Sequence, residues 1–93
     1  MIELVQTPRF KRNFKAFVKR NAKLEQSVRE TLEAMKSDPF APFLFTHKLS
    51  GKYVGMLACS CGYDCRIAFK IEKHSPGTQL ILLTDIGTHD DVY

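Results

Sequence analysis

The chain lacks the sequence features of several large classes of protein. No apolar run approaches the ~18 residues that a membrane-spanning helix needs, and the N-terminal MIELVQTPRF has no apolar signal-peptide core. Nucleophile elbows, phosphate-binding glycine loops and carboxylate-rich metal motifs are also absent from the sequence. We therefore expect one small domain over residues 1–93, with no metal, no small-molecule cofactor and no membrane partner.

Cysteine is scarce and confined to one stretch, CSCGYDC at 59–65. An odd number of three cysteines without a signal peptide indicates reduced thiols and a cytoplasmic location. The spacing C-x-C-x₃-C is not one that structural zinc sites use. Free cysteines commonly behave as small buried hydrophobes, so we expect all three in the core.

Acidic residues are nearly missing from the first part of the chain. Residues 1–23 contain seven basic residues and one acid, Glu3, for a net charge of +6, whereas the other 70 residues sum to −2. Such a basic segment attracts polyanions in a salt-dependent way, although a solvated helix face would look the same. The candidates for RNA contact in this segment are Lys11, Arg12, Lys15 and Lys19.

The first half of the chain predicts a strand followed by two helices. IELVQ alternates as a short strand does. Thr7-Pro8 is typical of a helix start, and an apolar stripe at helical period follows it. A second helix is predicted from about Lys23 until Asp38-Pro39 stops it. The segment FAPFLFT then connects to the next strand, and we expect its aromatic rings to pack on the core.

From residue 52 the period changes to two. KYVGMLACSC and CRIAFKIE form a hairpin around GYD, and LILLTDIG is the last strand. The order β-α-α-β-β-β predicts an α+β fold, a small antiparallel sheet with two helices packed on one face. Alternation assigns residues to the two faces of this sheet. We expect Cys65, Ile67, Phe69 and Ile71 under the helices, Ala58, Ser60, Arg66, Ala68 and Lys70 on the uncovered face, and Leu80, Leu82 and Ile86 anchoring the last strand.

Polar chemistry gathers on the uncovered face. His47 enters with Lys48 and Lys52 beside it, Asp64 and Arg66 lie at the hairpin turn, and His89 and Tyr93 follow the last strand. Two histidines, an acid and several cations suit metal-free cleavage of an RNA phosphodiester, in which protons are transferred and negative charge is stabilised. The alternative is that His89 merely caps the strand, since a lone histidine is more often structural.

The stretches THKLSGKYVGMLACSCGYDCRIAFKIE and LILLTDIGTHDDVY resemble the RelE/ParE superfamily of type II toxin–antitoxin toxins, and within it most closely the YafQ-like branch of messenger-RNA interferases. The resemblance rests on the H-x-L-x-G motif before the hairpin, the G-Y-D-x-R-I turn and the terminal G-T-H. It implies the RelE-like microbial RNase fold. It also implies a ribosome-dependent endoribonuclease that cuts messenger RNA and is neutralised by a cognate antitoxin.

By resemblance, His47 and His89 match functional histidines of the YafQ branch, Asp64 its acid and Tyr93 its terminal aromatic. Arg66 matches an arginine of RelE-like members. In this reading His89 is an acid/base group, and Tyr93 orients a base or the RNA backbone. Lys48, Lys52 and Ser60 are the candidates for contact with phosphate or RNA near these groups.

Two positions depart from the family pattern. Ser60 replaces a further histidine of the YafQ branch, and Met56-Leu57 replaces an arginine of RelE-like members. These departures keep two alternatives open. One is a catalytically weak or inactive domain that binds RNA or an antitoxin, and the other is a ParE-like inhibitor of DNA gyrase.

Overall fold

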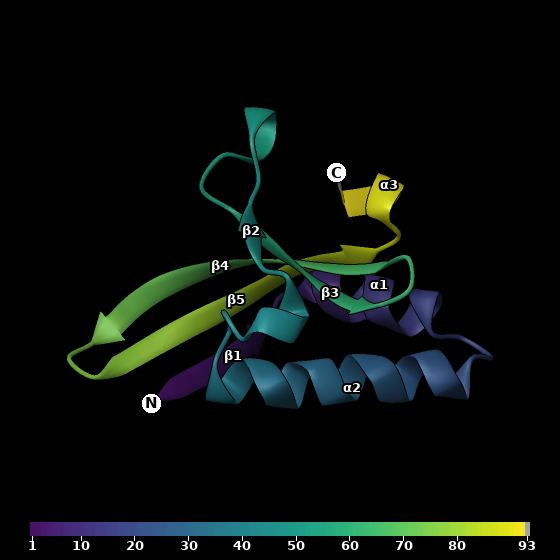
Figure 1. Cartoon of the computed structure of the whole chain (residues 1–93), viewed down its shortest axis with the longest axis horizontal. Coiled ribbons are helices and arrows are strands. Elements are labelled where there is room, and N and C mark those ends of the chain that lie inside the picture. The colour runs from purple at the N-terminus through teal and green to yellow at the C-terminus, as the bar shows by residue number, and fades with distance from the viewer. Residues whose placement is uncertain (93) are drawn as a thin grey trace.

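The computed structural model describes residues 1–92 and forms one five-stranded sheet with helices on both faces (Figure 1). The strands lie in the order β1-β5-β4-β3-β2. Their bounds are Ile2–Gln6 for β1, His47–Lys48 for β2, Leu57–Gly62 for β3, Cys65–Ser75 for β4 and Thr78–Gly87 for β5.

One pairing in this sheet is parallel. Strands β2 to β5 pair antiparallel, but β1 runs parallel to β5, so the prediction of an antiparallel sheet is wrong for this edge. The two helices that follow β1 carry the chain to the opposite edge of the sheet, where β2 and then β3 are added. Alternation within β1 sorts its faces but does not specify which strand becomes its neighbour.

Two helices cover one face of the sheet, as the sequence predicts (Figure 1). Helix α1 spans Pro8–Phe17, with the Thr7 side chain accepting a hydrogen bond from the Phe10 backbone N–H. Helix α2 spans Ala22–Ser37 and is capped in the same way by Asn21. None of the described helices is both long and apolar enough to span a membrane.

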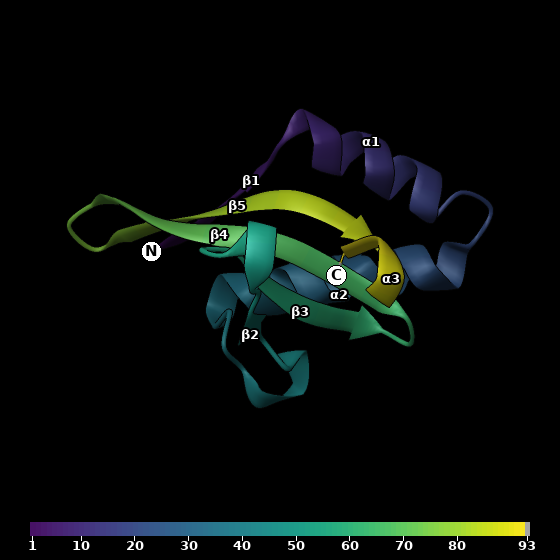
Figure 2. The ribbon, with the colours of Figure 1, turned by 90° about the horizontal axis from the view of Figure 1, so that it is seen from above.

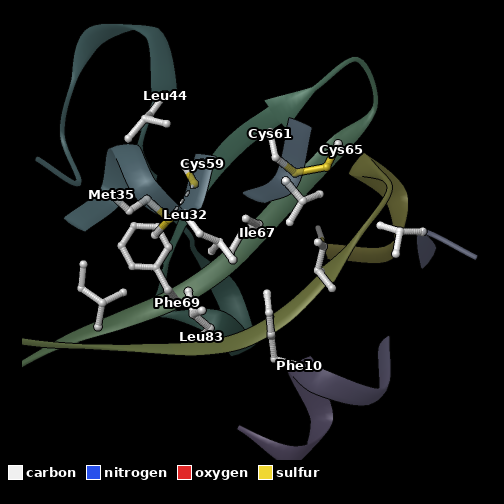
Figure 3. Close-up of a cluster of buried hydrophobic side chains, with 14 residues drawn as sticks. Phe10, Leu32, Met35, Leu44, Cys59, Cys61, Cys65, Ile67, Phe69 and Leu83 are labelled. Carbon is white, nitrogen blue, oxygen red and sulfur yellow. Dashed lines mark hydrogen bonds between the residues drawn. A yellow bond between two sulfur atoms is a disulfide. The ribbon is translucent and has the colours of Figure 1, made fainter. Parts of the chain in front are cut away.

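The core lies between these helices and the sheet (Figure 3). Cys65, Ile67 and Phe69 are fully buried there and Ile71 packs against them, which confirms the predicted inner row of the hairpin. Phe10 from α1 and residues of α2 fill the opposite side of the same cluster.

The alternation of core-facing residues in β5 shifts by one position halfway along the strand, which the sequence did not reveal. Ile81 and Leu83 are fully buried and Leu80 and Leu82 only partly, so the predicted anchors Leu80 and Leu82 are wrong. A register shift opposite Ala68/Phe69 places an extra residue, Thr84, in β5. One extra residue flips the alternation, and Ile86 is therefore buried as predicted.

The aromatic segment after α2 does not pack on the core. Phe40, Phe43 and Phe45 are 57%, 64% and 73% exposed, so the prediction that these rings are buried is wrong. A single 3₁₀ turn, η1 (Pro42–Leu44), turns only Leu44 inward. In such a tight turn one side chain can reach the core while its neighbours point to solvent.

The three cysteines are buried as predicted, but two of them form a disulfide (Figure 3). Cys61 and Cys65 face each other across the β3–β4 turn, with their Cα atoms 5.0 Å apart. The prediction of reduced thiols is therefore wrong for this pair. Cys59 keeps its thiol, and burial raises the pKa of that thiol to about 12, against a smaller lowering by the Arg66 guanidinium.

Thiol titration checks this arrangement. The native protein should not react with a thiol reagent near pH 8, because Cys59 is buried and its pKa of about 12 leaves almost no thiolate. Unfolding without reductant should expose one thiol per chain, and unfolding after reduction should expose three. Three reactive thiols without reductant would show that the disulfide is not formed in solution.

The other face of the sheet is partly covered. A short helix, α3 (His89–Val92), turns back over the ends of β4 and β5 (Figures 1 and 2). Val92 is buried with Ala58 and Ala68, so the prediction that these two alanines lie on an uncovered face is wrong. Ser60, Arg66 and Lys70 remain at least partly exposed on this face.

Candidate active site

A shallow pocket of about 380 Å³ lies on the face that carries α3. Its lining residues come from four separate segments of the chain, namely Phe45, His47, Ser60, Arg66 and His89. A neighbouring pocket of about 320 Å³ shares His47 and His89 and extends to Lys48 and Tyr53. The structure therefore brings together the two histidines that the sequence analysis singled out, 42 positions apart in the chain.

Strand β2 and the backbone of Phe45 position His47. His47 pairs with Ala58 of β3, which fixes its backbone at the edge of the sheet. Its Nδ1 lies 3.0 Å from the carbonyl oxygen of Phe45. A carbonyl can only accept, so Nδ1 carries the proton, and in the neutral ring the lone pair is on Nε2.

Helix α3 positions His89, and a reciprocal cap starts this helix. The Thr88 N–H donates to Asp91 Oδ2 at 3.1 Å, and the Asp91 N–H donates to Thr88 Oγ1 at 3.2 Å. A Cβ on Gly87 would lie only 2.7 Å from the Asp91 Cβ, so glycine is required for this close approach. The His89 Nδ1 lies 3.6 Å from Oδ1 of the fully exposed Asp90.

Asp64 connects the hairpin turn to α3. This residue has a left-handed backbone, with φ of 50°, and its Oδ1 accepts a hydrogen bond of 3.0 Å from the His89 backbone N–H. The carboxylate therefore holds the backbone of the histidine.

Arg66 is the cation of the pocket. It pairs with Ser60 on β3 and with Gly87 on β5, in the middle of the three strands. Its Nη1 lies 2.8 Å from the Cys65 carbonyl oxygen, 3.2 Å from that of Gly62 and 3.5 Å from Ser60 Oγ. All these contacts use one nitrogen, and the guanidinium has three more N–H donors on Nε and Nη2.

The remaining candidates lie outside the pocket. Lys48 lines the neighbouring pocket, and Lys52 Nζ lies 5.2 Å from the centre of the Tyr53 ring. Other basic side chains are exposed on α1 and on the turn after it, and α1 lies on the opposite side of the sheet from α3 (Figure 1). They are Lys11, Arg12, Lys15 and Lys19. Tyr93 lies outside the described residues.

Two features of the site were missed by sequence analysis. The Thr88-x-x-Asp91 spacing is a capping-box pattern that was available as a signal for α3. Phe45 gave no such signal, because nothing in the local sequence shows that Phe45 itself takes a left-handed backbone conformation after η1. Within residues 1–92, no three His, Cys, Asp or Glu side chains lie close enough to hold a metal ion.

Several solved structures of small bacterial toxins share the fold of this chain. YafQ from E. coli strain BL21(DE3) superposes with a TM-score of 0.79 at 13% identity, over 100% of this chain and 99% of that one. The YoeB/ParE toxin from Agrobacterium tumefaciens gives 0.76 at 16% identity, over 94% and 98%. YoeB in the YoeB–YefM complex from Staphylococcus aureus gives 0.72 at 14% identity, over 96% and 98%. At these identities the likeness shows the fold alone.

Sequence comparison supplies the family. The profile described as "Bacterial toxin of type II toxin-antitoxin system, YafQ" matches residues 2–93, and the chain belongs to this family. No curated protein matches the chain by sequence. The membership confirms the family that the G-Y-D-x-R-I turn and the terminal G-T-H indicated.

Proposed function

We propose that the protein is a ribosome-dependent endoribonuclease that cuts messenger RNA by metal-free acid/base catalysis. The observation that carries this proposal is the pocket that His47 and His89 share. Arg66, from the central strand β4, lines the same pocket. Two proton carriers and one fixed cation are the groups that attack of a 2′-hydroxyl on its own phosphodiester requires.

His47 is the general base in this proposal. Its Nδ1–H donates to the Phe45 carbonyl oxygen, which favours the neutral tautomer with the lone pair on Nε2. Nε2 takes the proton of the 2′-hydroxyl, and the 2′-oxygen attacks the adjacent phosphorus. A carbonyl partner on Nδ1 holds the ring in orientation without adding a charge.

His89 is the general acid. Its Nδ1 lies 3.6 Å from Oδ1 of the Asp90 carboxylate, and its side chain lines the pocket that also holds His47 and Arg66. The imidazolium gives its proton to the departing 5′-oxygen as the P–O bond breaks. The remaining N–H donors of Arg66 stabilise the phosphorane, and the products are a 2′,3′-cyclic phosphate and a 5′-hydroxyl.

Asp64 acts as a positioning residue, because its carboxylate holds the His89 backbone N–H at 3.0 Å. Asp64→Asn keeps an acceptor oxygen and should retain cleavage within about tenfold of wild type. Asp64→Ala removes the acceptor and should slow cleavage by about 10²-fold, as loss of acid alignment would. Rates as low for the asparagine variant as for the alanine variant would show that the negative charge itself is needed.

An antitoxin is the proposed protein partner. Solved YoeB–YefM complexes from Staphylococcus aureus show a toxin of this fold bound to its antitoxin. This chain carries a net charge of +4, concentrated in its first 23 residues, so an acidic segment that folds on binding suits it. Ribosomes, messenger RNA and this partner place the protein in the cytoplasm under this proposal.

The test is cleavage mapping on translating ribosomes. The wild-type protein should cut messenger RNA in the ribosomal A site and leave 2′,3′-cyclic phosphate ends. Intact messenger together with blocked translation would support the alternative of a catalytically inactive domain that binds RNA or an antitoxin. Ser60 in the pocket keeps this alternative open, because a hydroxyl cannot replace the imidazole of a histidine as a proton carrier near neutral pH. Intact messenger with DNA-damage signalling would support gyrase inhibition.

A further inference from the structure

Phe45 is an aromatic side chain on the wall of the proposed active site. It is 73% exposed and lines the same pocket as His47, Arg66 and His89. A large apolar ring exposed to water loses the free energy that burial would give it, and its place among cationic and titratable groups is not that of a core residue.

The backbone of Phe45 is also unusual. Its φ of 53° and ψ of 39° lie in the left-handed region, which a bulky residue rarely adopts. Both neighbours fix this conformation, since Leu44 is buried and the Thr46 hydroxyl donates to the Pro39 carbonyl oxygen at 2.6 Å. Backbone strain of this kind concentrates at functional sites, where the surrounding structure holds it in place.

We propose that the Phe45 ring stacks on a nucleobase of the bound messenger RNA, beside the phosphodiester that is cut. This inference rests on the endoribonuclease function proposed above. Stacking on an aromatic side chain binds any base, because every base has a π face. The ring would hold the base while Arg66 holds the phosphate, so the nucleotide is fixed at two points across the pocket.

The same residue would couple RNA binding to the general base. The Phe45 carbonyl oxygen accepts from His47 Nδ1 at 3.0 Å, while its ring lines the pocket. A base stacked on the ring therefore sets its ribose relative to the imidazole through a single residue. Placement of this kind lowers the barrier by orienting the reacting 2′-hydroxyl.

The composition of the pocket favours a nucleotide over a protein side chain. An apolar protein segment on Phe45 would also cover Arg66, whose guanidinium would then lose solvent without gaining a negative partner. A nucleotide supplies a flat apolar base for the ring and a phosphate for the cation. Phe43 lies on the same segment but lines a different pocket, with Glu30 and Thr31, and offers no such pairing.

The test compares ring variants at position 45 in single-turnover cleavage of messenger RNA on programmed ribosomes. Phe45→Ala should raise the toxin concentration needed for half-maximal rate by about 10- to 100-fold, the scale of one base–aromatic stack. Phe45→Tyr should stay close to wild type, and Phe45→Leu should be impaired because it keeps apolar area without a π face. Phe43→Ala, the matched control, should cleave as wild type does.

Abasic messengers make the test specific. Abasic nucleotides are placed singly at the three A-site positions, and at one of them the difference between wild type and Phe45→Ala should disappear. A difference that persists at all three positions, or an alanine variant that cleaves normally while the wild type cuts, overturns the stacking proposal and leaves the nuclease intact. A weakened antitoxin complex with unchanged cleavage would assign Phe45 to the protein partner instead. A wild-type protein that cuts no messenger would refute the nuclease function and this inference with it.

Discussion

His89→Ala should slow messenger-RNA cleavage on the ribosome by about 10²-fold or more, the usual scale for loss of a general acid or base. Its melting temperature should change by no more than about 4 °C, because the side chain is 56% exposed and exposed substitutions are nearly neutral.

The chain offers a matched control for this variant. His74 lies near the end of β4, is exposed and lines neither of the two pockets that contain His47 and His89. His74→Ala should therefore cleave at the wild-type rate. A His89→Ala protein that cuts messenger RNA at the wild-type rate, beside a truncation after Ile86 that unfolds, would show that the tail is structural.

Reversing three charges beside α1 should weaken ribosome binding by about 10²-fold or more in low salt. Lys11 and Lys15 lie on the helix and Lys19 in the turn after it, all exposed and off the apolar stripe. If each contacts phosphate, replacing all three with Glu should lower the slope of log affinity against log salt by about three. Co-sedimentation with ribosomes over a salt series measures both quantities.

A second triple variant separates position from net charge. Lys36, Lys70 and Lys73 are also exposed, and changing them to Glu alters the net charge by the same amount. This control should bind ribosomes more tightly than the α1 variant does. Equal loss in both variants would show that overall charge, and not the segment 1–23, determines ribosome binding.

Local patterns predicted much of the fold because each depends on near neighbours in the chain. The Thr7 cap and the buried row from Cys65 to Phe69 follow from one helix start and one alternating strand. The bulge at Thr84 and the parallel pairing of β1 with β5 could not be predicted in this way. Both depend on how distant strands register against each other.

The site divides along the same line. The proximity of His47 and His89 was anticipated, because His47 precedes the hairpin, His89 follows the last strand, and both were expected over one face of the sheet. The Cys61–Cys65 disulfide was not, since counting cysteines says nothing about two side chains meeting across a turn. Disulfides are rare in the reducing cytoplasm, so the thiol count should also be measured on protein taken directly from cells.

The most direct test of the acid/base account replaces the leaving oxygen. In the test messenger, the 5′-bridging oxygen at the cut site is changed to sulfur. The leaving group is then a thiolate, which needs no proton from an acid. On this messenger His89→Ala should cleave at nearly the wild-type rate, whereas His47→Ala, which lacks the base, should remain slow. If His89→Ala is as slow on the sulfur messenger as on the normal one, His89 is not the general acid and the account is wrong.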